Sequence, residues 1–141
     1  MSKKLWLGGI YLKEEGGYEI ILVSLIHYKK RLQTIHESPE LKEAAAMFAP
    51  ILQSTARKKM PIIAEAKEKI YQCLLNLIPA QSLEENLEIL QKALECRKAD
   101  IEKAEDTGAE YFINLLGDVS EAKKDLGLIE KAITKINQYS E

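Results

Sequence analysis

The residue types that most often carry chemistry are scarce in this 141-residue chain, and their spacing limits what they can do together. There are two histidines, His27 and His36, and two cysteines, Cys73 and Cys96. Nine residues turn a regular helix by about 900°, so the two histidines would point to opposite sides and could not chelate one ion. So few ligands argue against a tetrahedral zinc site and against a disulfide scaffold. We therefore expect no metal ion and no cofactor.

Neither cysteine has the surroundings of a catalytic nucleophile. Cys73 belongs to a row of apolar residues spaced three or four apart, which would share one helix face and which we call a seam. It is typical of a small core residue. Cys96 lies off its seam, and nothing near it in the sequence would activate it. The sequence also lacks a phosphate-binding Gly-x-x-x-x-Gly-Lys loop, a Gly-x-Ser-x-Gly elbow and a His-Glu-x-x-His pair. These observations favour a protein that is not an enzyme.

One pair of residues supports an alternative. Arg31 and His36 form an Arg-x-x-x-x-His string, which resembles the signature of HEPN domains. These are all-helical bundles of about this size, and many are dimeric ribonucleases that use no metal. The resemblance implies that Arg31 would hold an RNA phosphate and that His36 would transfer protons during attack by the 2′-hydroxyl. In the other interpretation, Arg31 and His36 complement the negative end of a helix dipole.

The charge of the chain gives only weak support to nucleic-acid binding. The net charge is −2 and the isoelectric point is near 5.8, so no overall field would attract nucleic acid or anionic lipid. Three short basic clusters occur, at 29–31, 57–59 and 123–124. A nucleic-acid-binding subunit of a larger complex is our third hypothesis, and it requires these clusters to form one contiguous face.

The apolar periodicity predicts a single helical domain over residues 1–141. We expect an all-α bundle of four or five helices behind an irregular or short-hairpin arm at 1–17. The predicted helices are 18–37, 39–57, 61–78, 82–106 and 108–139. Residues 18–26 are so apolar that they also fit a buried strand, but the helical spacing continues to Ile35 and favours a helix. Pro50 is expected to kink or split the second helix.

The last two predicted helices carry the clearest pattern. Their apolar residues alternate in steps of three and four, and a short turn at 106–108 separates them. Two such seams joined by a tight turn predict a long antiparallel hairpin. Gly117 leaves a break of the last helix open, although the unbroken phase of the seam favours one long helix.

Arg97 is the one charged residue on these seams. An unpaired charge in a dry core costs several kcal/mol, so Arg97 needs a carboxylate partner. The antiparallel register places it near Asp118 and Glu121, and we predict an Arg97–Asp118 pair. The alternative is a packed stem with the guanidinium in water.

The arm carries two large side chains, Trp6 and Tyr11, which we interpret as interaction anchors. The most apolar run, Ile20–Ile26, has seven residues including Ser24, whereas a membrane span needs about 20. From these features we expect a soluble, cytoplasmic protein with reduced thiols. Its predicted function is that of a non-enzymatic interaction or assembly protein, working as a homodimer.

Overall fold

A computed structural model describes residues 17–35, 45–75, 77–78 and 80–140 of the protein. Most of these residues are helical and none of the described residues is in a strand, which confirms the all-α bundle. Trp6, Tyr11 and His36 lie outside the described residues, so their predicted roles stay predictions. None of the helices in the described ranges combines the length and the apolar character needed to cross a lipid bilayer.

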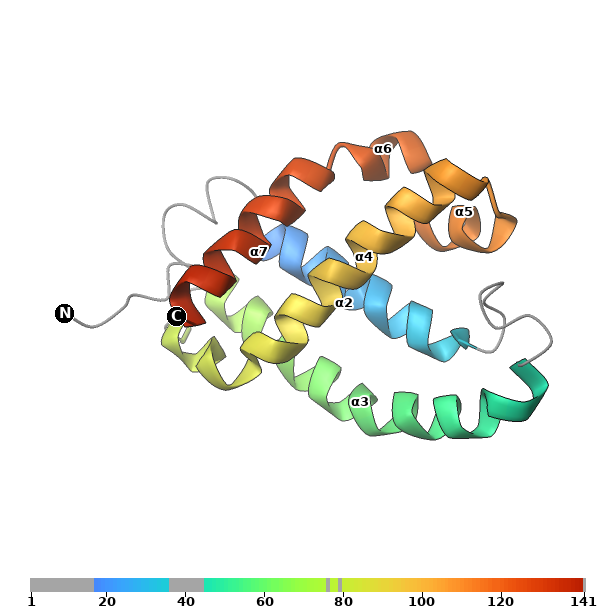
Figure 1. The fold of residues 1–141 in the computed structure, drawn as a ribbon. Coiled ribbons are helices and arrows are strands. Elements are labelled where there is room, and N and C mark those ends of the chain that lie inside the picture. Colours follow the sequence, from blue (N-terminus) through green and yellow to red (C-terminus); the bar gives the residue numbers. More distant parts are fainter. Residues whose placement is uncertain (1–16, 36–44, 76, 79, 141) are drawn as a thin grey trace.

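Helix α2 (Gly17–Gln33) runs through the middle of the bundle. Residues 18–26 are helical rather than extended, as the spacing favoured, and the helix ends four residues before the predicted end at 37. α3, α4 and α7 all pack against α2, and Figure 1 shows α4 crossing it. Contact on several sides explains why the first half of α2 is apolar around most of its circumference.

Helix α3 (Ala45–Leu74) is one continuous helix, so the prediction of separate helices ending at 57 and starting at 61 is wrong. It contains both Pro50 and Pro61, each of which costs about 3 kcal/mol in a helix interior. Both prolines are exposed, and the residues between the two predicted helices are good helix formers. Burial of Ile63, Ala66, Ile70 and Cys73 offsets the cost of Pro61, whereas Leu77, the last residue of the predicted seam, is exposed.

Helix α4 (Leu87–Thr107) begins later than predicted, because a 3-10 segment, η3 (Ala80–Asn86), takes the place of its first turn. The side chain of Glu85 in η3 pairs with Lys69 of α3. At its other end α4 stops as predicted. Gly108 adopts a φ of 64° and its N–H bonds to the carbonyl of Ala104 at 3.0 Å, which is a left-handed helix cap.

The last part of the chain forms three helices instead of one, namely α5 (Glu110–Leu116), α6 (Val119–Lys123) and α7 (Leu126–Ser140). The break lies at Gly117, the alternative that the sequence left open, and the single long helix at 108–139 is wrong. Gly117 has a φ of 78°, a conformation that glycine adopts at little cost. Asp118 then caps α6 by accepting a hydrogen bond from the N–H of Glu121 at 3.2 Å.

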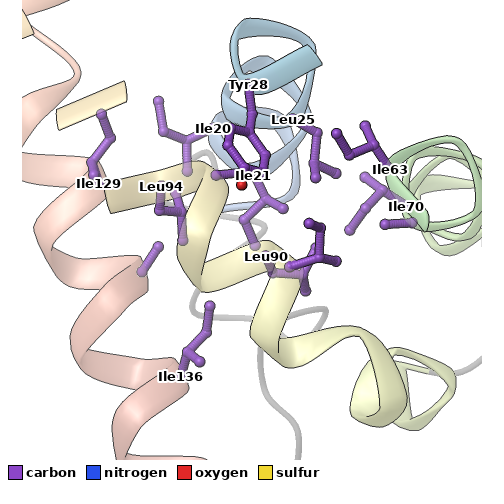
Figure 2. Packing of buried hydrophobic residues seen from close by; sticks show 14 of the residues in the cluster. Ile20, Ile21, Leu25, Tyr28, Ile63, Ile70, Leu90, Leu94, Ile129 and Ile136 are labelled. Atoms are coloured by element: carbon purple, nitrogen blue, oxygen red, sulfur yellow. The ribbon is translucent and has the colours of Figure 1, made fainter. Parts of the chain in front are cut away.

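One apolar core joins the four longest helices. Figure 2 shows it between α2, α3, α4 and α7, where the side chains interdigitate. Its most buried members include Ile21 and Leu25 of α2, Ile70 of α3, Leu94 of α4 and Ile129 of α7. Leu90, Leu94, Ile101 and Ile136 lie on the seams predicted from the sequence and are fully buried. The seam pattern therefore located the core even where it misjudged the helix ends.

Candidate functional site

Four side chains that can carry chemistry meet where α2 and α4 cross. His27 and Arg31 are four residues apart on α2, and Cys96 and Asp100 are four residues apart on α4. Residues at this spacing share one helix face, so the crossing brings both pairs together. Asp100 is 1% exposed, His27 4% and Arg31 8%. We call these four residues the polar cluster.

Asp100 is the centre of the polar cluster. Its Oδ2 atom lies 2.8 Å from Nε2 of His27 and 3.2 Å from Nε of Arg31. The thiol of Cys96 donates to the same oxygen at 3.7 Å. The other oxygen, Oδ1, accepts a longer hydrogen bond of 3.4 Å from Nε of Arg31. Three groups from two helices thus converge on one carboxylate.

Arg31 connects the polar cluster to α5. Its guanidinium donates to the hydroxyl of Tyr111 at 3.2 Å, and it lies 5.3 Å from the centre of the Tyr111 ring. The Tyr111 hydroxyl in turn donates to the carbonyl of Thr34 at 3.1 Å. Burial alone would lower the pKa of Arg31, but Asp100 and Tyr111 together raise it above its ordinary value. Arg31 is therefore a permanent cation that ties three segments together.

The thiol of Cys96 is protonated in this environment. Burial, with the nearby carboxylate of Asp100, raises its pKa from 9.0 to about 12. A thiol in this state is a poor nucleophile at neutral pH. This agrees with the expectation that Cys96 is not activated for catalysis.

The polar cluster nevertheless presents a set of metal-ligating atoms that the sequence analysis did not bring together. Single ligand atoms of His27, Cys96 and Asp100 all lie within 4.8 Å of one another. Nδ1 of His27 is buried and has no hydrogen-bond partner among the described residues. These three side chains could hold one cation.

A sequence signal for this cluster existed. Beside the predicted seam of α4 runs a second one, in which Ile89, Ala93, Cys96 and Asp100 follow in steps of four, three and four. Three of these side chains are buried and Cys96 is half-buried. A second seam indicates a helix that packs on two sides. It would have placed Asp100, one of only four aspartates in the chain, inside the bundle.

Of the two residues proposed for ribonuclease activity, the structure describes only Arg31. Arg31 is buried in the polar cluster, where Asp100 and Tyr111 hold its guanidinium. His36 lies outside the described residues, so their separation is not known. An RNA phosphate would have to displace Asp100 or Tyr111 from Arg31, and the observed contacts therefore give the ribonuclease hypothesis no support.

Arg97 is buried and paired, but with a different carboxylate from the one predicted. Nη2 of Arg97 lies 3.2 Å from Oδ2 of Asp125. The predicted Arg97–Asp118 pair is therefore wrong. The break at Gly117 changes the course of the chain, and Asp118 is used as the cap of α6. Asp125, seven residues further on, stands just before α7 and takes the pairing role.

A second feature is an apolar surface made by α2 and α3. Ile26 of α2 is 46% exposed, Tyr71 of α3 is 45% exposed, and Leu75, in the turn directly after α3, is 69% exposed. We call these three residues the α2–α3 surface. Beside them lies a groove lined by Lys29 and Gln33 of α2 and by Met60, Pro61, Ala64 and Lys67 of α3.

Comparisons with protein-family models, with curated proteins and with solved structures found no match for this chain. The functional argument therefore depends on the geometry of the polar cluster and the α2–α3 surface.

Proposed function

We propose that this chain is a non-enzymatic interaction or assembly protein that works as a homodimer in the cytoplasm. The observation that carries the proposal is the α2–α3 surface, where three large apolar side chains, one from α2 and two from the end of α3 and the turn after it, are exposed. Monomeric proteins rarely leave large apolar patches in water. A partner that covers this surface would remove the cost of exposing it.

The helical repeat places the three side chains on one side of the molecule. The groove shows that Lys29 of α2 and Lys67 of α3 lie on the same side of these two helices. Figure 1 shows that α2 and α3 run in opposite directions. Ile26 precedes Lys29 by three residues, and Tyr71 follows Lys67 by four. Because the helices run in opposite directions, both residues lie about one turn from the two lysines in the same direction and on the same side. Leu75 continues that side by one more turn.

The charges around this surface suit a second copy of the same chain. A two-fold interface places the same patch on both partners, so it must be complementary to itself. The exposed Glu68 of α3 and the half-buried Lys29 and Lys67 supply both signs of charge close to the apolar residues. A two-fold axis through the patch would allow carboxylates of one protomer to face ammonium groups of the other.

The basic clusters do not favour the nucleic-acid hypothesis. Lys123 pairs with Glu105 at 3.1 Å and Lys124 pairs with Glu121 at 2.9 Å. Arg31 is buried and bound to Asp100. These carboxylates reduce the positive potential that a phosphate backbone would need.

Light scattering at micromolar concentration tests the proposal. We expect a mass of about twice 16.0 kDa for the natural chain, and a monomer for Leu75→Glu, because a charge would be trapped in the apolar centre of the interface. The matched control is Ile51→Glu on α3, where Ile51 is 64% exposed. It stands 20 residues before Tyr71, a rotation of about 2000° that places it on nearly the opposite side of the helix, so this variant should remain a dimer.

A folded monomer for the natural chain would overturn the proposal. A dimer that persists in Leu75→Glu but dissociates in Ile51→Glu would show that a different surface pairs. Circular dichroism confirms in each case that the variant is folded.

A further inference from the structure

We propose that His27, Cys96 and Asp100 form a binding site for one zinc ion, which locks α2 onto α4. This inference does not depend on the proposed dimer. It comes from the ligand chemistry, the spacing and the burial of the three side chains.

The ligand set suits zinc in particular. Zn²⁺ is bound in proteins by imidazole nitrogen, thiolate sulfur and carboxylate oxygen, whereas magnesium and calcium prefer oxygen alone. The polar cluster offers one atom of each kind, from two helices that are already packed together. Metal sites in helical bundles are commonly built from side chains on facing helices in this way.

The distances between the ligand atoms are close to those that zinc needs. Bonds of about 2.0 to 2.3 Å in a tetrahedral arrangement place neighbouring ligand atoms roughly 3 to 4 Å apart. The Asp100 oxygen lies 2.8 Å from the His27 nitrogen and 3.7 Å from the Cys96 sulfur. The three atoms stay within 4.8 Å of one another. Small side-chain rotations, without movement of either helix, would therefore bring them into coordination range.

The buried state of His27 is the second observation. Its Nε2 atom faces Asp100, while Nδ1 is buried with no hydrogen-bond partner among the described residues. Buried polar atoms without a partner are rare, and each calls for an explanation. When Nε2 binds zinc, the imidazole proton resides on Nδ1, where a water molecule would accept it, because the second nitrogen of a metal-bound histidine normally has a partner.

Arg31 is placed to support the site without joining it. Its Nε atom lies 3.2 Å from Oδ2 and 3.4 Å from Oδ1 of Asp100, so a small rotation toward Oδ1 would leave Oδ2 for the ion. Its positive charge is shared with the hydroxyl of Tyr111 and lies against the rings of Tyr111 and Phe112, 5.3 and 5.7 Å from their centres. Such contacts stabilise the guanidinium beside a second cation, and a hydrogen bond from Arg31 orients the ligating carboxylate.

The chemistry of binding balances without any redox step. The Cys96 thiol loses its proton to solvent as the sulfur–zinc bond forms, and the imidazole proton is held on Nδ1 of His27. One thiolate and one carboxylate neutralise the charge of the ion. Three protein ligands leave a fourth position for a water molecule.

Cobalt(II) is the probe for the test, because a thiolate bound to cobalt gives an intense charge-transfer band in the near ultraviolet. Reduced protein, freed of metal by a chelator, is titrated with Co²⁺ and then with Zn²⁺. We expect one equivalent of Co²⁺ per chain, a thiolate band that Zn²⁺ removes by displacement, and a higher melting temperature with Zn²⁺. Cys96→Ala should lose the band and weaken Zn²⁺ binding by more than about 100-fold.

The chain supplies its own matched controls, since histidine and cysteine each occur twice. Cys73→Ala and His36→Ala should keep the band and the stoichiometry, whereas His27→Gln should weaken binding. Absence of a thiolate band in the natural chain would overturn the proposal, as would a band that persists in Cys96→Ala or disappears in Cys73→Ala. Circular dichroism of the metal-free variants separates loss of binding from loss of folding.

Discussion

At the scale of single residues, two buried arginines show how far sequence reasoning reaches. Arg97 interrupts an apolar seam, and this interruption predicted a buried arginine in need of a carboxylate. The structure confirms that Arg97 is buried and that it pairs with an aspartate, but the partner is Asp125 instead of Asp118. The partner depended on the backbone break at Gly117, which a seam pattern does not contain. Arg31 was interpreted as a ligand for an RNA phosphate or as a complement to the helix dipole, and its partner Asp100 was overlooked.

The two arginine–aspartate pairs differ in burial, and this difference gives a prediction. Asp100→Asn removes the charge that faces buried Arg31, and breaking a buried pair typically costs about 3–5 kcal/mol. Asp125→Asn is the matched change in a pair whose carboxylate side chain is 29% exposed, where we expect a loss of about 1 kcal/mol. Urea unfolding of metal-free protein measures both. Equal losses would contradict the central role of Asp100 in the bundle.

At the scale of the elements, the errors share one physical cause. Helix seams report which side chains are buried, and they do not show whether the backbone between two buried residues is continuous. This is why Phe112 and Ile136, on either side of the break, are both buried on the seam while the break at Gly117 stayed undecided. The two prolines in α3 caused the opposite error, since a proline disfavours a helix only by a finite energy. Burial of Ile63 and Ile70 outweighs that energy.

Two glycines in the last part of the chain should respond to the same substitution with opposite signs. Gly117 has a φ of 78°, which strains any other residue, so Gly117→Ala should destabilise the protein by about 1 kcal/mol or more. Gly127 lies inside α7, and an added Cβ would meet no atom within 4 Å. Gly127→Ala should therefore stabilise by about 0.5–1 kcal/mol. Thermal unfolding of both variants checks the pair. A stabilising Gly117→Ala would mean that the last helix is continuous.

At the scale of the whole molecule, α4 is the element to which the rest is attached. It packs against α2, α3, η3, α5, α6 and α7, and it supplies Asp100 to the polar cluster and Arg97 to the pair with Asp125. The sequence predicted the fold class and most of the core, because both follow from periodicity. It did not predict the polar cluster, because a contact between His27 and Asp100 spans 73 residues and depends on how two helices cross.

A homodimer that covers the α2–α3 surface links association to folding. When only the folded chain associates, each tenfold rise in protein concentration adds about 1.4 kcal/mol per dimer to the stability. We therefore expect the melting temperature of the natural chain to rise with concentration from the micromolar to the millimolar range. Leu75→Glu should melt at one temperature across this range, because its monomer has no partner, and Ile51→Glu should keep the dependence. A melting temperature of the natural chain that does not change with concentration would show that the exposed apolar side chains of α2 and α3 pair with something other than a second copy.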